Sequence, residues 1–217
     1  MFNKHNISFE FSSSYITCNK LTDKTENIWI VFHGYGQLSK YFIRRFDVLE
    51  GDKNYIIAPQ GLSKFYVDED YKNVGASWLT KEDKESDLLN QQKYLIKLMD
   101  ELKSKIDFSK IKINLFGFSQ GVSAFTRLLI NYNMKIDNII IWAGWVPDEF
   151  FNINKNVLKD TNLFFVIGNK DKYYNNPIIK GYIEKFKKTL NKEIDYFVFD
   201  GGHIVDRKVL KKINEKL

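Results

Sequence analysis

The chain alternates short apolar runs with longer stretches in which apolar residues recur at helical spacing. Three runs, IWIVF, INLFGF and NLFFVI, are almost continuous in apolar residues, which is typical of strands buried on both faces of a sheet. The runs predicted to be strands cover 6–17, as two short strands, then 27–32, 54–58, 111–116, 138–143, 163–167 and 194–199. Helical periodicity lies between them at 39–48, 82–105, 120–133, 177–190 and 206–217. Strands that alternate with helices predict an α/β fold, with a mainly parallel central sheet and helices on both faces.

The length of the chain suits one domain. Its 217 residues are typical of a single α/β domain, and no stretch of low complexity marks a linker. We therefore predict one domain over 1–217. The segment 61–78 has no periodicity, and a connection this long in a compact domain is typical of a lid or of the wall of a substrate pocket.

Composition and charge restrict the partners. Lysine and arginine outnumber the acids by 33 to 27, for a net charge of +6, but they are scattered among acids, as in KEDKE at 81–85. This pattern favours a solvated surface over a nucleic-acid footprint. No run approaches the roughly 20 apolar residues of a membrane span, and the start MFNKHNISFEF lacks the apolar run of a secretory signal. The single cysteine, Cys18, can form no internal disulfide. We predict a cytoplasmic protein with no nucleic-acid partner and no stable membrane insertion, and its oligomeric state stays open, a homodimer included.

Glycines and polar residues gather just after the predicted strands. In a parallel sheet, ligands bind at the carboxyl ends of the strands, so these segments are the candidates for chemistry. They read HGYG at 33–36, PQG at 59–61, GFSQG at 117–121, GWVP at 144–147, GNKD at 168–171 and GGH at 201–203. Serine, aspartate and histidine follow one another there in that order.

Nucleophilic catalysis by serine needs a base, and the base needs a third group that orients it. Of the three histidines, His5 precedes the first strand, and His33 ends a buried strand where its imidazole is expected to bind the loop. His203 follows a strand and two glycines, and it is the predicted base. For the acid, Asp171 follows a strand at the same end of the sheet, and Asp200 is the competitor because it lies near His203 in sequence. The order serine, aspartate, histidine favours Asp171.

The serine segment also has the features of an oxyanion site. A residue at the tip of a tight strand-to-helix turn is forced toward positive φ, at a cost of order 1–3 kcal/mol. Gly117 and Gly121 remove side chains that would collide around Ser119. Because Ser119 lies at a helix N-terminus, the N–H of Gln120 points to where an oxyanion would form, and the HGYG turn presents the N–H of Tyr35 as a second donor.

These segments resemble the phospholipase/carboxylesterase family of α/β-hydrolases, which includes acyl-protein thioesterases. HGYGQ resembles its oxyanion loop, and GFSQG its nucleophile elbow, with the glutamine after the serine. APQG, GASW and AGWVP resemble the intervening signatures, and GNKD and GGHIV the acid and histidine segments. The likeness runs from about residue 29 to the end of the chain. It implies an α/β-hydrolase fold, the triad Ser119, Asp171 and His203, oxyanion donors at Tyr35 and Gln120, and neither a cofactor nor a metal.

Two segments depart from the family pattern, and both concern the substrate. The residues after the acid are KYY at 172–174, where the family usually has a Val-Pro step, and the loop 61–75 does not match the usual acyl-pocket segment. Aromatic residues placed after strand ends are the candidates for substrate contact, although each suits a place in the core equally well. These are Tyr66, Trp78, Trp145 and Tyr173.

The favoured function is a serine esterase that cleaves a small-molecule ester or other acyl substrate, with thioesters as a further class, through an acyl-enzyme. The turn HGYG lacks the third glycine and the later acid of a dinucleotide site, and the three histidines form no recognisable set of metal ligands. A catalytically idle α/β-hydrolase fold used for binding stays open as an alternative, and so does a serine peptidase of the same fold.

Overall fold

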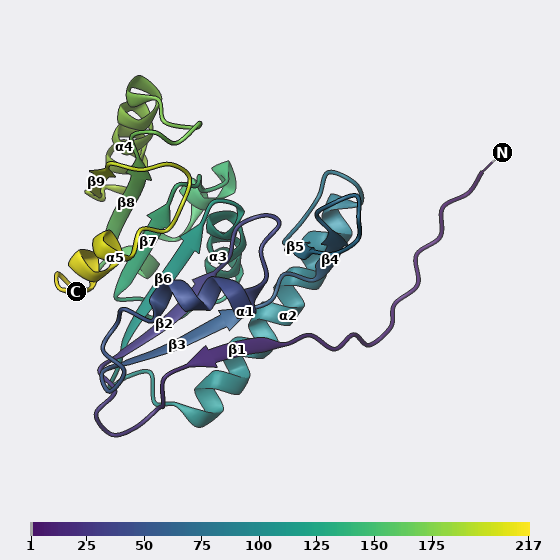
Figure 1. Cartoon of the computed structure of the whole chain (residues 1–217), viewed down its shortest axis with the longest axis horizontal. Helices are drawn as coiled ribbons and strands as arrows, with labels where there is room; N and C mark the ends of the chain where they lie inside the picture. The colour runs from purple at the N-terminus through teal and green to yellow at the C-terminus, as the bar shows by residue number, and fades with distance from the viewer. Residues whose placement is uncertain (1) are drawn as a thin grey trace.

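A computed structural model describes residues 2–217 of the chain. Its centre is a seven-stranded sheet in the order β1-β3-β2-β6-β7-β8-β9, in which only the edge strand β1 runs antiparallel to its neighbour (Figure 1). The strands are β1 (Tyr15–Cys18), β2 (Asn27–Phe32), β3 (Asn54–Pro59), β6 (Lys112–Phe118), β7 (Asn138–Trp142), β8 (Asn162–Gly168) and β9 (Asp195–Phe199). The predicted α/β fold with a mainly parallel sheet is confirmed.

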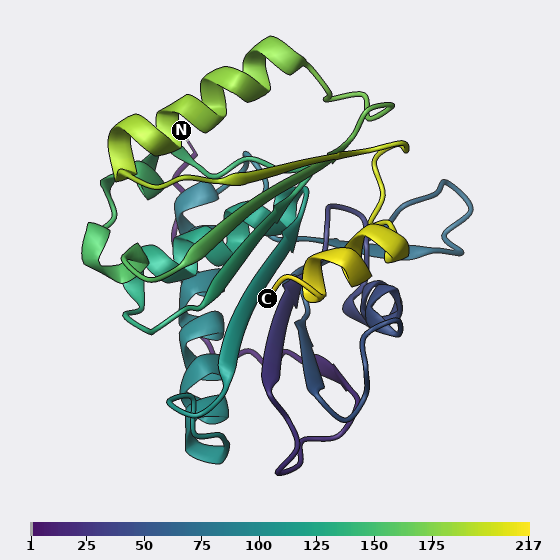
Figure 2. The ribbon, with the colours of Figure 1, turned by 90° about the vertical axis from the view of Figure 1, so that its left-hand side faces the viewer.

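Helices cover both faces of this sheet. On one face lie α2 (Lys84–Lys105), α3 (Gln120–Asn131) and α4 (Asn176–Leu190), and on the other α1 (Ser39–Phe42), η1 (Ile43–Phe46) and α5 (Arg207–Asn214) (Figure 2). Two short 3₁₀ helices, η2 (Asp148–Asn152) and η3 (Lys155–Leu158), connect β7 to β8. The almost continuous apolar runs of the sequence become β2, β6 and β8, whose residues are buried apart from the first. They are apolar on both sides because both sides meet helices.

Two predicted segments differ in the structure. Residues 6–17 contain one strand, β1, instead of two, and the stretch before it runs extended and away from the body of the molecule (Figure 1). The alternation of Ile7, Phe9 and Phe11 is typical of a strand, but a strand also needs a neighbour for its N–H and C=O groups, and these three side chains are exposed. The segment 61–78 is not irregular, because it contains the antiparallel hairpin of β4 (Ser63–Tyr66) and β5 (Val74–Ser77). Strands of four residues are too short to show a period.

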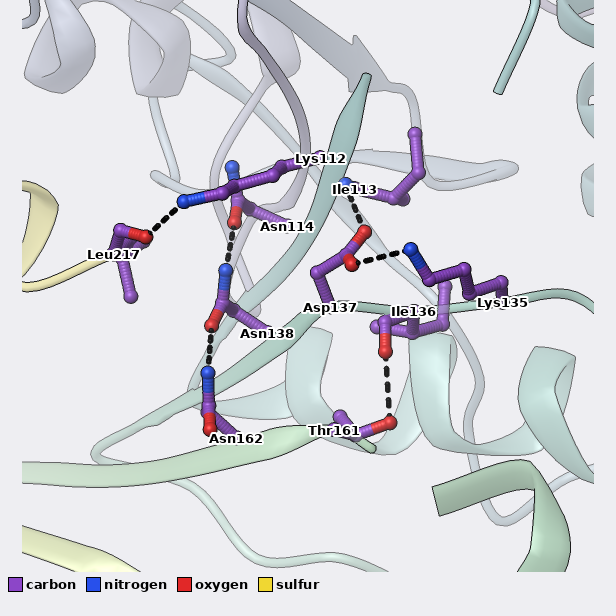
Figure 3. A network of polar contacts seen from close by, with 10 residues as sticks. All are labelled: Lys112, Ile113, Asn114, Lys135, Ile136, Asp137, Asn138, Thr161, Asn162 and Leu217. Atoms are coloured by element: carbon purple, nitrogen blue, oxygen red, sulfur yellow. Dashed lines mark hydrogen bonds and ion pairs between the residues drawn. The ribbon is translucent and has the colours of Figure 1, made fainter. Parts of the chain in front are cut away.

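Four asparagines join the amino ends of the central strands. The side-chain amide of Asn162 donates to Asn138 at 2.9 Å, and that of Asn138 donates to Asn114 at 2.7 Å (Figure 3). Asn114 in turn donates to Asn27 at 3.4 Å. Asn114 and Asn138 are buried, so each amide depends on its neighbours for hydrogen bonds. This asparagine ladder fixes the mutual register of β2, β6, β7 and β8, and therefore the relative positions of their opposite ends.

Candidate active site

Ser119 occupies a strained turn between β6 and α3. Its backbone has φ +54° and ψ −119°, a conformation that side-chain-bearing residues rarely adopt. The Ser119 N–H donates to the carbonyl of Trp142 at 2.9 Å, which ties the turn to β7. A Cβ on Gly121 would lie 2.2 Å from the Phe32 carbonyl oxygen, and one on Gly144 would lie 2.4 Å from the Ser119 oxygen. The turn is thus held by backbone contacts that only glycine permits.

Asp171 and His203 meet at the same end of the sheet. The Asp171 Oδ2 lies 2.6 Å from the His203 Nδ1, and the Asp171 Oδ1 accepts the Tyr173 N–H at 2.9 Å. The Asp171 side chain is 0% exposed and that of His203 is 26% exposed, so the acid is covered and the imidazole reaches solvent. A carboxylate accepts only, so Nδ1 carries a proton, and in the neutral ring the lone pair is therefore on Nε2. This is the arrangement of a general base with its orienting acid.

The competing acid lies elsewhere. The Asp200 carboxylate is exposed and pairs with the Lys170 ammonium at 2.7 Å, and this contact lowers the pKa of Asp200. The loop that carries His203 is instead fixed by two other contacts. The Gly201 carbonyl accepts the Lys170 N–H at 2.9 Å, and the Ile204 carbonyl accepts the Trp142 indole N–H at 2.8 Å. No sequence pattern predicts the indole contact, because it joins residues 62 positions apart.

Phe118, the residue before Ser119, packs against His203. The Phe118 and His203 rings lie 4.7 Å apart between centroids, which brings the histidine against the residue before the serine. Among residues 2–217 the Ser119 hydroxyl has no hydrogen-bond partner, so it forms no hydrogen bond with the His203 imidazole in this structure. In enzymes without substrate this bond is often long and tightens only in the complex.

Two backbone donors flank the turn. Within the described part of the chain, neither the Tyr35 N–H nor the Gln120 N–H has an acceptor. The HGYG turn lies against the serine turn, since a Cβ on Gly34 would be 2.9 Å from the Phe118 ring and one on Gly121 would be 2.7 Å from the His33 oxygen. Both donors are therefore free to bind an anionic oxygen.

His33 has a structural place behind this turn. Its ring is buried, and its Nε2 accepts the Gly61 N–H at 3.0 Å while its Nδ1 faces the Gly34 carbonyl at 2.8 Å. Only the neutral ring with the proton on Nδ1 satisfies both contacts. Burial lowers the pKa of His33 from 6.5 to about 4, so the ring stays neutral near pH 7. The prediction that this imidazole binds the loop is confirmed.

The four aromatic candidates lie in different surroundings. Tyr173 is exposed, and its ring meets the His203 ring edge-on at 5.3 Å. Trp78 is only 2% exposed and donates its indole N–H to the His33 carbonyl, so it is a core residue without a free face. Trp145 packs on Phe165 and Tyr182, and Tyr66 packs on Tyr71 at the hairpin. Sequence reasoning missed Phe65, whose ring lies 5.1 Å from that of exposed Tyr35.

The described residues contain neither a membrane-spanning helix nor a cluster of metal ligands. No helix within 2–217 is long and apolar enough to cross a membrane. The same residues contain no group of three or more histidine, cysteine or acidic side chains arranged to hold a metal ion. The geometry is that of a serine turn, an imidazole with its carboxylate and two free amides, which together suit attack on a carbonyl carbon.

Comparison with known proteins gives one family and many solved structures. The sequence model of the phospholipase/carboxylesterase family matches residues 14–217. A search of curated proteins finds no similar sequence.

The similar structures agree in fold and differ widely in sequence. Acyl-protein thioesterase 2 from Zea mays is 13% identical with a TM-score of 0.71, over 94% of this chain and 97% of that chain. The phospholipase/carboxylesterase from Dyadobacter fermentans is 19% identical with a TM-score of 0.67, over 97% and 98%. The Bacillus cereus carboxylesterase is 16% identical with a TM-score of 0.66, over 94% and 92%. At such identities the likeness establishes the fold, which is that of the α/β-hydrolases.

Proposed function

This chain belongs to the phospholipase/carboxylesterase family, and we propose that it is a serine hydrolase that cleaves carboxylic esters, with thioesters as a further class, through an acyl-enzyme. Family membership makes it a hydrolase of the carboxylesterase type. The observation that carries the finer proposal is the 2.6 Å contact between Asp171 and His203, at the sheet end where Ser119 sits in its strained turn. The proposed reaction needs no cofactor.

In each half of the proposed reaction, His203 acts first as a base and then as an acid. Its Nε2 takes the proton of the Ser119 hydroxyl as the oxygen attacks the carbonyl carbon, and the N–H groups of Tyr35 and Gln120 bind the resulting oxyanion. Asp171 keeps the imidazole in the Nδ1–H tautomer and stabilises its protonated form. His203 then gives the proton to the leaving alcohol or thiol, which departs. A water molecule, deprotonated by the same Nε2, then attacks the acyl carbon; the bond to the Ser119 oxygen breaks, that oxygen takes the proton back from Nε2, and the carboxylic acid is released.

Aromatic rings around the site favour an apolar acyl or alcohol group. Tyr173 lies against the imidazole, and exposed Tyr35 of the HGYG turn pairs with the half-buried ring of Phe65. Apolar rings with a few convergent polar groups are typical of sites for small molecules. Trp78 takes no part in this proposal because it is buried. We propose small-molecule esters with an apolar group as the substrate class.

Ser119→Ala tests the mechanism. In an assay with p-nitrophenyl esters, kcat should fall by about 10⁴ or more, because the nucleophile is lost. The matched control is Ser123→Ala, in the first turn of α3, four residues after Ser119, which should keep its activity. Ser119→Ala should also lose labelling by a fluorophosphonate probe. A much smaller fall in kcat would refute the assignment, and a wild-type protein that neither hydrolyses esters nor reacts with the probe would instead be an idle binding protein.

Asp171→Asn and Asp200→Asn separate the two acids. Asp171→Asn should reduce kcat by about 10⁴, because the amide can donate to Nδ1 and so favours the wrong tautomer. Asp200→Asn should leave kcat within twofold of wild type, since it removes only an exposed ion pair. The assignment fails if Asp200→Asn is the inactive variant and Asp171→Asn is active.

A further inference from the structure

The side chain of Gln120 turns away from the reacting groups and binds the end of β5. Its Oε1 accepts the Trp78 N–H at 3.0 Å, and its Nε2 donates to the Leu79 carbonyl at 2.9 Å. The Ser77 hydroxyl donates its one proton to the Leu79 carbonyl at 2.7 Å, which leaves it to accept from the Gln120 Nε2 at 3.1 Å. The amide of Gln120 thus forms three hydrogen bonds to a segment about forty residues earlier in the chain.

The same segment holds the HGYG turn from its other side. Ala76 accepts the Gly36 N–H at 2.9 Å and donates its own N–H to the Gln37 carbonyl at 3.1 Å. The Trp78 indole N–H donates to the His33 carbonyl at 2.8 Å. Tyr35 therefore lies between anchored neighbours, and these three bonds all come from Ala76 and Trp78.

This connection is buried and has little freedom to adjust. Ala76, Ser77 and Trp78 are at most 2% exposed. Just before them, a Cβ on Gly75 would lie 2.4 Å from the Gly36 carbonyl oxygen, so β5 and the HGYG turn are in backbone contact. A displacement of residues 76–78 must move the turn with them, because packed interiors transmit strain.

We propose that the Gln120 side chain is a positioning group, which through residues 76–78 fixes the place of the Tyr35 N–H relative to the N–H of Gln120 itself. The inference rests on the proposed function, in which these two donors bind the oxyanion. Such donors must lie about 2.7–3.1 Å from the oxyanion, and loss of one costs roughly 10²–10³ in rate. The two donors come from segments far apart in sequence, and the Gln120 amide links them indirectly: it bonds residues 77–79, and Ala76 and Trp78 bond the HGYG turn and Gln37.

Side-chain substitution separates this role from the backbone role of the same residue. Any replacement except proline keeps the N–H of residue 120, so the donor itself remains. Gln120→Met has a similar length and removes all three hydrogen bonds. We expect kcat to fall about 10- to 100-fold, less than for complete loss of a donor, because Tyr35 becomes misplaced but is still present. KM should change less than threefold.

A trifluoromethyl ketone distinguishes positioning from simple destabilisation. Ser119 adds to such a ketone to give an oxyanion, so its inhibition constant should rise in Gln120→Met by the same factor by which kcat/KM falls. Thr126→Val is the control, because Thr126 is buried on the same helix and its hydroxyl bonds only to that helix. The control should lose thermal stability and keep both kcat and the inhibition constant. If Gln120→Met unfolds, Ser77→Ala takes its place in the experiment. This variant removes only the hydroxyl, so kcat and the inhibition constant should change in the same directions by smaller factors.

The results distinguish failure of the positioning role from failure of the proposed function. An active wild type together with a folded Gln120→Met of equal kcat would overturn the positioning role alone. A fall in kcat without a matching rise in the inhibition constant would overturn it too. A wild type that hydrolyses no ester and binds no fluorophosphonate would overturn the proposed function itself. Support comes from parallel changes in both constants, with Ser77→Ala adding little to them in the Gln120→Met background, as expected of residues that act together.

Discussion

Gly168 lies where the acid loop and the histidine loop come closest. A Cβ at this position would be 2.1 Å from the Gly201 carbonyl oxygen and 2.7 Å from that of Gly202. Ordinary van der Waals contact begins near 3.4 Å, so Gly168→Ala requires the Gly201 carbonyl to move by about 1.3 Å. Both obstacles are backbone atoms, which cannot swing aside as a side chain end can. His203 is two residues further on and must move with this carbonyl.

The expected result of Gly168→Ala is a large loss of activity at a modest loss of stability. A misplacement of about 1 Å at a reacting group can cost 10²-fold, and we expect kcat/KM for a p-nitrophenyl ester to fall by about that factor. Overpacking should destabilise the fold by about 1–3 kcal/mol, measured by urea unfolding. Gly181→Ala is the control, because Gly181 is within α4 and has no atom within 4 Å of its would-be Cβ. It should keep full activity and gain up to about 1 kcal/mol.

A folded Gly168→Ala whose kcat/KM stays within threefold of wild type would refute the link between this backbone contact and catalysis. Such a result would mean that the histidine loop moves without disturbing the contact between Asp171 and His203. If both glycine variants lose activity equally, the loss is unrelated to the loop contact. A crystal structure of Gly168→Ala with an unchanged distance between Asp171 and His203 would also contradict the mechanism.

Two further predictions concern stability. Asn138→Leu removes two hydrogen bonds of the asparagine ladder and leaves its neighbours without partners, so urea unfolding should show a loss of about 2–5 kcal/mol, whereas Asn162→Ala at the exposed end of the ladder should cost about 1 kcal/mol. His33 stays neutral in the folded state down to about pH 4, while the unfolded chain binds the proton near 6.5. Its contribution to stability is therefore complete above pH 6.5 and is lost as the pH falls to about 4, which amounts to about 3 kcal/mol. That portion of the pH dependence should be absent in His33→Gln, and an unchanged pH profile would refute the assigned protonation.

The sequence predicts the buried strands well and the edges of the fold poorly. The runs that became β2, β6 and β8 are apolar throughout, and their predicted bounds differ from those observed by at most two residues. The extended segment before β1 has strand-like alternation but no neighbouring strand, and no local pattern reveals whether a neighbour exists. The hairpin of β4 and β5 has the reverse problem. Its strands are short and pair with each other, so the period is absent although the partner is present.

For the candidate site, too, the sequence predicts the residues that follow buried strands and not the contacts made by loops. Ser119, Asp171 and His203 could be proposed from sequence because each follows a strand, and strand ends meet at one edge of the sheet. The bonds from the Gln120 amide could not, because they join residues 41 to 43 positions apart and follow no periodicity. Partners of this kind depend on how a loop folds back. The available sequence signal was the serine of the GASW segment, because a polar residue between apolar neighbours suggests a buried hydrogen bond.

The glycines of the site serve close approach more than backbone conformation. Within residues 2–217 the only glycine with positive φ is Gly36, whereas the strained turn after β6 is occupied by Ser119. Gly121, Gly144 and Gly168 instead lie where a Cβ would overlap a backbone oxygen of another segment at 2.1 to 2.4 Å. The loops that carry the proposed groups are therefore packed main chain against main chain, which fixes their spacing more firmly than side-chain contacts would. It follows that alanine at these glycines should impair catalysis more than stability, a pattern opposite to that of substitutions in the asparagine ladder at the far end of the sheet.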